Sequence, residues 1–599
     1  MDVEAIRKQI AGLPVRDYMG IIKLARRLKK EQDLSGRDKV KVAVIGSCSL
    51  QYFVMVLRLF LCKYCVGAEI LEGEYDGIHM AVFDKQSELY KFQPEAVIVL
   101  SDYRDIRAFP PVLSAPEEVD AFVRETMGYF ETLWRRLSDI KGCHIFQSNI
   151  VIPLERALGN FETNVYYSRR NIYQMLNLEL LKNRSDNVTI VDLEYIASMV
   201  GKERWFDNTS YFTSKLGYAL DYIGVVCDIF AQQIAVLKGR VRKCLVLDLD
   251  NTLWGGVAAD EGARGIQVDP GDAVGEAYLA FQKYILDLKS RGVILAVISK
   301  NDLESAKGPF EVNQNMLLKY EDFSVFIANW ESKAENMELV SRKLNIGIDS
   351  LVFFDDNPAE REIIKMYHPE VQVIDVPENV ADYVLALEQA HPFEWLNLTE
   401  EDLNRSDTYK SNRQREELSM RYEDYQNYLN ALEMRGKVQS LEKGGIKRFT
   451  QLINKSNQFN LRTQRYSEAQ IAEMLSDEEY ILLSAVLEDR FSKFGMISCV
   501  ILKKEGTACF IDTWVMSCRV LKRDVEKLVF HKIIESAQHW GCTEITGEYI
   551  ETRKNALVKK LFSDLNFEEV RGDGCSGRKW YICKVSDAKI MEDIAIEEM

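Results

Sequence analysis

The feature that most constrains the fold is a series of short apolar runs, each followed by polar side chains and separated from the next by a helical pattern. In the middle of the chain, Asp248 and Asp250 follow one run, and Asp355 and Asp356 follow another. Short β-branched runs between helical patterns are typical of βα units and a parallel sheet. Because the carboxyl ends of parallel strands meet at one edge of a sheet, we expect these acids to lie close together.

The alternation of runs and helical patterns occurs in two separate series, which predicts two α/β domains and a further mixed α/β domain behind them. At 599 residues the chain is too long for one hydrophobic core, and roughly 100 to 200 residues per domain gives three. The predicted parts are residues 1–238, 239–395, a charged helical connector at 396–427, and 428–599. The acidic tail after residue 587 is expected to fray.

Charge and composition exclude several classes of partner. The formal net charge of -16 would repel a phosphate backbone, so we expect no nucleic acid partner. No run approaches the roughly 18 to 20 apolar residues that span a bilayer, and the N-terminus lacks the apolar core of a signal peptide. We therefore expect a cytoplasmic protein without a membrane partner. The 12 cysteines have no regular spacing, which favours neither a disulfide framework nor a zinc site.

The polar residues at the ends of the middle runs form a set suited to phosphate chemistry. Asp248 and Asp250 stand two positions apart, so an extended backbone places both on one side. Like charges held together need a cation, and Mg²⁺ takes carboxylate oxygens while keeping a substrate phosphate in its shell. Ser299 and Asn301 follow the next run, and Lys333 supplies an ammonium after a later loop. We therefore expect a magnesium site that handles a phosphoryl group.

The order of acid pair, hydroxyl, ammonium and acid pair resembles the haloacid dehalogenase superfamily. The resemblance implies that Asp248 attacks phosphorus and becomes an aspartyl phosphate. It also implies that Asp250 protonates the leaving group and later activates the hydrolytic water.

The same resemblance implies the binding residues. Ser299, Lys333 and Asn301 would bind the transferring phosphoryl group. The implied metal ligands are Asp248, Asp250 and Asp355. Asp356 could share the task of Asp355, and the sequence does not choose between them.

Sequences around these positions narrow the resemblance to the FkbH-like group, subfamily IIIC of the superfamily. They read Leu-Trp-Gly-Gly-Val at 253–257, Ser-Lys-Asn at 299–301, Asn-Trp at 329–330, and Asp-Asp-Asn-Pro-Ala-Glu-Arg-Glu at 355–362. The resemblance covers nearly the whole chain. It implies a flavodoxin-like domain similar to SGNH hydrolases, a Rossmannoid phosphatase-like domain, and a mixed α/β domain similar to GNAT acetyltransferases.

The group's activity implies a specific reaction. A glyceryl unit would be taken from 1,3-bisphosphoglycerate, its phosphate removed, and the acyl group loaded on the phosphopantetheine thiol of an acyl carrier protein, as in polyketide biosynthesis. Two alternatives stay open: a stand-alone phosphatase for a small metabolite, and a scaffold that binds carrier proteins and has vestigial catalysis.

The first domain departs from the hydrolases that it resembles. Their first strand ends in Gly-Asp-Ser with a nucleophilic serine, whereas this chain reads Gly-Ser-Cys at 46–48 and places Cys48 at the nucleophile position. The late catalytic Asp and His should lie near residues 207–211, but no histidine occurs between His144 and His368. A thiol without an imidazole base stays largely protonated near neutral pH, so a scaffold or docking role is the main alternative to hydrolysis.

The last domain departs from the acetyltransferases. Their pattern has glycines where this chain has Lys522 and Asp524, at a strand-to-helix turn that holds a pyrophosphate. Asp524 would repel such a group. Lys522 and Arg523 could instead attract a carrier's phosphopantetheine, or simply form a solvated helix start.

Overall fold

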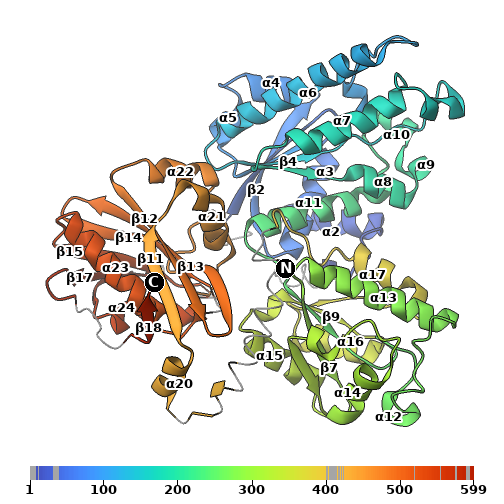
Figure 1. The fold of residues 1–599 in the computed structure, drawn as a ribbon. Helices are drawn as coiled ribbons and strands as arrows, with labels where there is room; N and C mark the ends of the chain where they lie inside the picture. The colour runs from blue at the N-terminus through green and yellow to red at the C-terminus, as the bar shows by residue number, and fades with distance from the viewer. Residues whose placement is uncertain are drawn as a thin grey trace. The chain divides into compact units, whose positions relative to one another are not determined.

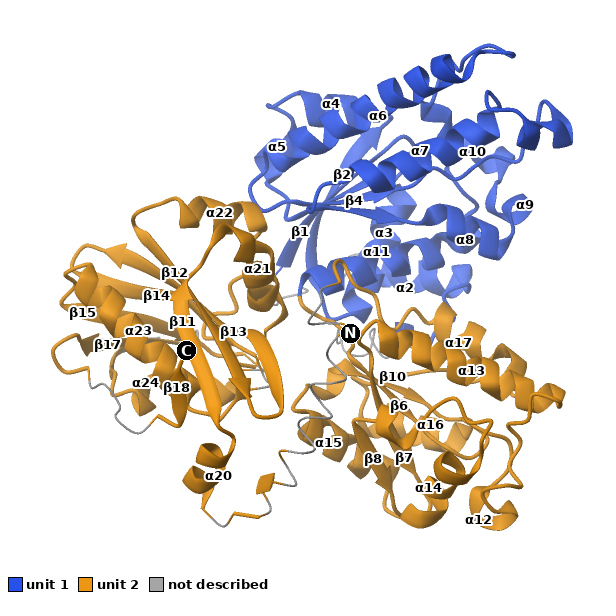
Figure 2. Cartoon of the chain, viewed as in Figure 1, with its two compact units in different colours: residues 1–238 blue, residues 239–599 orange. Residues whose placement is uncertain are grey.

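The computed structural model describes most of the chain, with interruptions. The described residues are 9–10, 12–30, 39–398, 403, 415, 418–419, 421–422, 424–456, 458–517, 520–552, 555–573, 577–588 and 594–599. The chain divides into two compact units, residues 1–238 and 239–599, which Figure 2 shows in different colours. Most of the connector expected at 396–427 lies outside the described residues.

A parallel five-stranded sheet forms the centre of the first unit. Its strands are β1 (Lys39–Gly46), β2 (Gly67–Tyr75), β3 (Ala96–Leu100), β4 (His144–Ser148) and β5 (Val188–Val191). They pair in the order β2-β1-β3-β4-β5, and all pairings are parallel. This is the strand order of flavodoxin-like doubly wound sheets. It confirms the α/β class predicted for this part.

Helices cover both faces of this sheet (Figure 1). They are α2 (Tyr18–Lys30), α3 (Gln51–Lys63), α4 (Ile78–Phe83), α5 (Glu88–Phe92), α6 (Pro116–Ser138), α7 (Arg169–Asn183), α8 (Leu193–Val200), α9 (Lys202–Trp205), α10 (Asn208–Ser214) and α11 (Ile223–Leu237). Phe130 of α6 and Leu176 of α7 join one buried cluster with the strands. Phe53 of α3 packs edge-on against Phe230 of α11, with 5.6 Å between ring centroids. Strands β1, β3 and β4 are therefore largely buried on two sides, which explains their apolar runs, whereas the edge strand β2 is mostly exposed or partly exposed.

Contrary to the expectation that no run approaches this length, one stretch of the described chain, Leu220–Leu237, is long and apolar enough to cross a membrane by length and composition. The structure buries 61% of it inside the protein. Within it, Asp228 accepts hydrogen bonds from Lys63 Nζ at 3.0 Å and from the Tyr64 hydroxyl at 2.7 Å. Packing inside the first unit accounts for the composition of this helix.

A second parallel sheet lies at the start of the second unit. Its strands are β6 (Cys244–Leu247), β7 (Ile294–Ser299), β8 (Val325–Ala328), β9 (Leu351–Phe354) and β10 (Gln372–Val373), in the order β10-β9-β6-β7-β8. Its helices are α12 (Ala258–Glu261), α13 (Ala273–Ser290), α14 (Leu303–Val312), α15 (Lys333–Leu344), α16 (Pro358–Tyr367) and α17 (Tyr383–Gln389). Leu247 at the end of β6 pairs with Val297 of β7 and Phe354 of β9. This register brings the polar ends of three strands to one edge.

The remainder of the second unit holds a mixed eight-stranded sheet, in the order β16-β17-β15-β14-β13-β12-β11-β18. Its strands are β11 (Met434–Ser440), β12 (Tyr480–Asp489), β13 (Ser492–Glu505), β14 (Ala508–Met516), β15 (Glu544–Ile550), β16 (Glu568–Asp573), β17 (Arg578–Lys584) and β18 (Ile596–Glu598). The helices are α20 (Tyr425–Ala431), α21 (Ile446–Lys455), α22 (Glu468–Leu475), α23 (Val525–His539) and α24 (Leu561–Asp564).

The end of the acidic tail is ordered, so the expectation that it frays was wrong. Strand β18 pairs in parallel with β11, matching Ile596 to Met434. Ile596 is 7% exposed and belongs to the core of this part. Burial of one apolar side chain and a short ladder of backbone hydrogen bonds hold the last residues against the edge of the sheet.

Candidate active site

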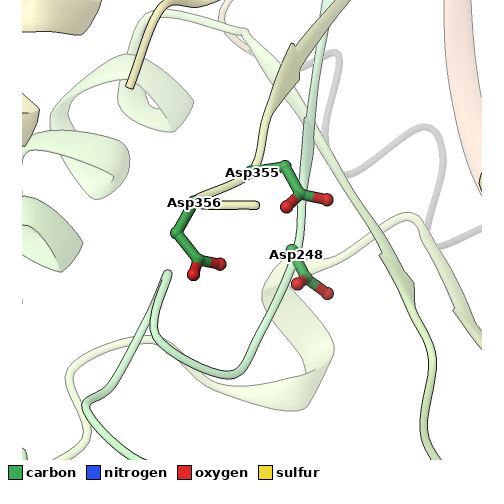
Figure 3. Close-up of side chains that lie close together, drawn as sticks. All are labelled: Asp248, Asp355 and Asp356. Atoms are coloured by element: carbon green, nitrogen blue, oxygen red, sulfur yellow. The ribbon is translucent and has the colours of Figure 1, made fainter. Parts of the chain in front are cut away.

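Three carboxylates meet at the carboxyl edge of the second parallel sheet. Asp248 follows β6, and Asp355 and Asp356 follow β9; each offers an oxygen within 4.8 Å of the others (Figure 3). Asp355 is fully buried and Asp248 is 8% exposed. Asp250, which was also expected at the metal, is not a member of this group, whereas Asp356, which the sequence left open, is.

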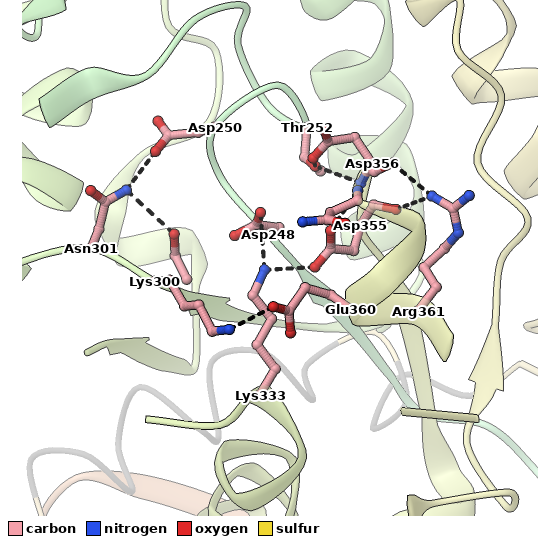
Figure 4. A network of polar contacts seen from close by, with 12 residues as sticks. Asp248, Asp250, Thr252, Lys300, Asn301, Lys333, Asp355, Asp356, Glu360 and Arg361 are labelled. Carbon is pink, nitrogen blue, oxygen red and sulfur yellow. Dashed lines mark hydrogen bonds and ion pairs between the residues drawn. The ribbon is translucent and has the colours of Figure 1, made fainter. Parts of the chain in front are cut away.

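A buried ammonium lies between two of these carboxylates. Lys333 begins α15, and its Nζ lies 2.6 Å from Asp355 Oδ2 and 3.1 Å from Asp248 Oδ2 (Figure 4). Burial disfavours the charged amine, but the two carboxylates outweigh burial and raise the pKa of Lys333 above its usual value. The residue is therefore a fixed positive charge at the site.

The negative charge of Asp248 is only partly balanced by its neighbours. Burial, and to a lesser degree the charge of Asp355, raise the pKa of Asp248 to about 7 despite the attraction of Lys333. Its Oδ1 is buried and has no hydrogen-bond partner in the described part of the chain. Three carboxylates against one bonded ammonium leave two negative charges, which a divalent cation would balance. Oxygen donors of this kind fit Mg²⁺.

Asp250 is held away from that group by hydrogen bonds of its own. Its Oδ1 accepts from the Trp254 indole and from the Ala258 backbone, both at 2.9 Å. Its Oδ2 accepts from Asn301 Nδ2 at 2.6 Å, and the same amide lies 3.5 Å from the Ser299 hydroxyl. Asn301, expected at the phosphate, thus orients Asp250 in this structure (Figure 4). Ser299 is 2% exposed and ends β7, in the predicted place.

Two residues that the sequence did not indicate fix the second acid pair. The Thr252 hydroxyl donates to Asp356 Oδ1 at 3.1 Å and accepts from the Asp356 amide at 3.3 Å. Arg361 donates to the carbonyl oxygens of Asp355 and Asp356, each at 2.8 Å. Burial first, and then the charge of Asp355, raise the pKa of Asp356. Asp356 is therefore held in position, and burial and the charge of Asp355 raise its pKa as they raise that of Asp248.

The edge of the first sheet holds a different group. Cys48, Asp102 and Gly217 line a cavity of about 30 Å³. Burial, and then the charge of Asp102, raise the pKa of Cys48 to about 12. A thiol in this environment stays protonated near neutral pH and is a poor nucleophile.

The acids beside Cys48 are already partnered. Asp102 accepts hydrogen bonds from the guanidinium of Arg104, at 3.0 and 2.9 Å, and from its backbone amide, at 2.9 Å. The guanidinium stacks on Tyr211, 3.6 Å from its ring centroid. Asp207, in the segment where a catalytic acid was expected, accepts from the Ser210 amide at 3.1 Å and caps α10. No imidazole of the described residues lines the cavity. The group is satisfied internally and lacks a base.

The helix start of the C-terminal part does not fit a coenzyme A pyrophosphate. Lys522 and Asp524 adopt φ values of +61° and +59°, as the glycines of the acetyltransferase pattern would. Asp524 is 8% exposed, and its Oδ2 has no hydrogen-bond partner in the described part of the chain. Its Oδ1 pairs with Lys527 Nζ at 2.8 Å, so the start of α23 holds a buried carboxylate with a cation of its own where the acetyltransferase pattern has a glycine.

A segment of the chain itself fills the gap between β14 and β15. These strands pair up to Ile511 and Gly547, and then separate. Beyond that point the Met516 amide donates to the Phe459 carbonyl at 3.2 Å, and the Ile550 amide donates to the Leu461 carbonyl at 2.9 Å. The segment from Phe459 to Leu461 therefore accepts one backbone hydrogen bond from each of the separated strands.

Comparisons with known proteins support the resemblance to FkbH-like proteins. Residues 41–235 match a family model described as FkbH, N-terminal domain. A solved structure from Bacteroides fragilis, the N-terminal part of the protein BF1531 containing a phosphatase domain complexed with Mg, is 32% identical with a TM-score of 0.58. The match covers 62% of this chain and 99% of that chain. No curated protein matches the sequence.

Other solved structures match a smaller share of the chain with lower scores. The ribosomal-protein-S18-alanine N-acetyltransferase from Escherichia coli is 13% identical, with a TM-score of 0.21 over 26% of this chain and 98% of that chain. The PaiA N-acetyltransferase from Thermoplasma acidophilum, in complex with coenzyme A, is 12% identical, with a TM-score of 0.21 over 25% and 98%. Scores this low carry no argument about activity. By the N-terminal match and the BF1531 structure, the chain belongs to the family of FkbH-type proteins, which join an FkbH N-terminal domain to a phosphatase domain of the haloacid dehalogenase type.

Proposed function

We propose that residues 239–395 catalyse a Mg²⁺-dependent phosphoryl transfer of the haloacid dehalogenase type. The observation that carries the proposal is the group of Asp248, Asp355 and Asp356, with an oxygen of Asp248 that is buried and unbonded in the described chain. The phosphatase domain of BF1531, complexed with Mg, supports the same activity.

The chain's residues divide the work of the reaction. Mg²⁺, when bound by the three carboxylates, would neutralise charge on the phosphoryl oxygens. Lys333 adds a fixed positive charge beside Asp248, and the Ser299 hydroxyl donates to a phosphoryl oxygen. These groups stabilise the charge that builds up at phosphorus as its bonds change.

One carboxylate forms the bond to phosphorus, and a second transfers the protons. Asp248 attacks phosphorus and displaces the substrate oxygen, which takes a proton from Asp250. Asp250 then removes a proton from water, which attacks phosphorus and releases inorganic phosphate and free Asp248. The hydrogen bonds from Trp254 and Ala258 fix Asp250 for both steps.

We further propose that the substrate is a phosphorylated three-carbon acid, 1,3-bisphosphoglycerate, and that an acyl carrier protein receives the glyceryl group. The carrier's pantetheine thiolate would attack the acyl carbonyl, forming a C–S bond as the bond to the acyl phosphate breaks and phosphate leaves. The phosphate ester at the other end would be removed at Asp248. Between Cys244 and Cys499 the sequence has no cysteine, and burial raises the pKa of Cys244, so the thiol comes from the carrier.

The test is incubation of the full chain with 1,3-bisphosphoglycerate, Mg²⁺ and a carrier encoded beside its gene, followed by intact mass of the carrier. We expect a mass gain of one glyceryl group with the native protein and none, or a retained phosphate, with Asp248→Asn. Phosphate release without acylation of any neighbouring carrier would support a stand-alone phosphatase instead. An equal carrier mass after incubation with the native protein and with Asp248→Asn would support a scaffold.

A further inference from the structure

An ion pair beside the catalytic group has no role in the mechanism above. Lys300 follows Ser299, and its Nζ lies 2.6 Å from Glu360 Oε1 in the first turn of α16. Figure 4 shows the pair beside Lys333 and Asp248, at the same edge of the sheet. The two residues are 60 positions apart in sequence, so the pair links the loop after β7 to the helix after β9.

The two partners differ in their access to solvent. The side chain of Glu360 is 10% exposed and that of Lys300 is 41% exposed. The other oxygen, Glu360 Oε2, is buried with no hydrogen-bond partner in the described chain. Lys300 therefore balances the buried carboxylate with one of its three N–H donors, and its 41% exposed side chain remains accessible to a second anion.

A buried carboxylate is costly to keep, because an apolar pair of similar volume is often as stable or more so. Its presence is explained if it holds a cation that the site needs. The ammonium directly follows Ser299 in sequence and lies at the same edge of the sheet as Asp248 (Figure 4), on which the phosphoryl group of a substrate would be held.

We propose that Lys300 determines specificity by binding a second anionic group, a carboxylate or acyl phosphate, at the end of the substrate opposite the transferred phosphoryl group. The inference rests on the proposed function and names the substrate class of that site: short phosphate esters of acids, rather than phosphate esters of neutral alcohols. Glu360 fixes Lys300 in the position from which it donates.

The test compares two three-carbon phosphate esters that differ at one end, 3-phosphoglycerate and glycerol 3-phosphate, with the full chain and Mg²⁺. We expect Lys300→Met to lower kcat/KM for 3-phosphoglycerate roughly 10- to 100-fold, chiefly through KM, as for loss of one charged hydrogen bond. With glycerol 3-phosphate the change should stay within about twofold, which also reports that the variant is folded. Lys300→Arg should retain most of the preference.

Lys365→Met is the matched control. Lys365 lies on α16, the helix of Glu360; its side chain is 41% exposed, like that of Lys300, and it pairs with Glu362 and Asp375 at 2.9 and 3.2 Å. It should leave both esters unaffected. An equal fall of Lys300→Met with both esters, or no fall with either, overturns the inference and leaves the proposed function standing. A native protein that hydrolyses neither ester nor 1,3-bisphosphoglycerate overturns the proposed function and the inference together.

Discussion

The carboxyl edges of the two parallel sheets carry similar buried acids that differ in their bonding partners. At the first edge, Asp102 pairs with Arg104, and Asp105 accepts hydrogen bonds from the Ser47 hydroxyl and the Asp102 amide, although burial raises the pKa of both acids. At the second edge, Asp248 keeps a buried oxygen that has no partner in the described chain, beside two further carboxylates. Topology delivers polar side chains to both edges. A charge left uncompensated distinguishes the second edge as the one built for a cation and a phosphate.

The nucleophile positions differ in the same way. Burial raises the pKa of both Cys48 and Asp248. A divalent cation at the second edge would reverse the effect on Asp248 and hold it ionised. At the first edge, backbone hydrogen bonds at Gly217 and Cys48 offset the burial of the thiol only in part, so its pKa stays raised. A strand end therefore becomes a reactive site only where the surroundings favour the reactive form of the nucleophile.

The largest expected effect separates the two edges directly. Asp248→Asn should lower phosphate release by at least about 10³-fold, because an amide oxygen is not a nucleophile for phosphorus. Cys48→Ala should stay within about twofold of the native rate. Steady-state release of inorganic phosphate measures both.

The thermal midpoint controls for folding in that experiment. Asn has the shape of Asp and relieves the repulsion from Asp355, so Asp248→Asn should not lower Tm without metal. A large loss of phosphate release in Cys48→Ala, at unchanged Tm, would contradict the assignment of the two edges.

The next largest effect should come from removing the fixed positive charge of Lys333 at the second edge. Lys333→Met leaves Asp248 and Asp355 buried without their ammonium, so we expect a loss of about 3 kcal/mol in the free energy of unfolding without metal. Phosphate release should fall roughly 10²- to 10³-fold. Denaturant melts with and without Mg²⁺ measure the first effect, and the metal should recover part of it.

Lys289→Met is the control for that variant. Lys289 pairs with Asp322 at 2.7 Å in the same domain, with a side chain 18% exposed. Its loss should cost less stability and leave phosphate release unchanged. Equal effects of the two variants would show that Lys333 is an ordinary ion-pair partner.

A smaller effect is expected from replacing Asp356, one of the two acids that follow β9. Asp356→Asn should raise the Mg²⁺ concentration for half-maximal activity by roughly tenfold or more, as for a weakened ligand set. Asp375→Asn, in an exposed ion pair with Lys365, should not. Chelator should abolish activity in every active variant, and Mg²⁺ should restore it. Unchanged metal dependence in Asp356→Asn would leave Asp355 and Asp248 as the carboxylate ligands.

Local patterns predicted the strands that build the site. Asp248, Ser299 and Asp355 stand where the sequence placed them, at or just after strand ends. These features follow from periodicity and from the rule that parallel strands share an edge.

Contacts between distant segments could not be predicted in this way. Thr252 meets Asp356 across 104 positions because β6 and β9 pair in one register, and the register of a parallel pair is not written in either strand. Asp250 alternates with Asp248 in an extended pattern, but its bonds to Trp254 and Ala258 turn it away from the metal group. The prediction that the tail frays was wrong for a related reason. Its acidic composition gave no sign that Ile596 pairs with Met434 of β11.

The smallest expected effect concerns acid at the first edge. Burial raises the pKa of Asp105 to about 6, partly offset by the Ser47 hydroxyl. A carboxyl whose folded pKa exceeds its unfolded value of about 3.9 takes up protons on folding, so its contribution to stability falls as pH rises from about 4 to 6. Asp105→Asn removes that dependence, and the difference in unfolding free energy between variant and native should change by about 1 to 2 kcal/mol across the window, after allowance for partial exposure. Chemical denaturation of both proteins at pH 4 and pH 6.5 measures it. A difference that does not change with pH would mean that Asp105 is ionised at both values, and that the first edge holds an uncompensated charge of the kind that marks the second.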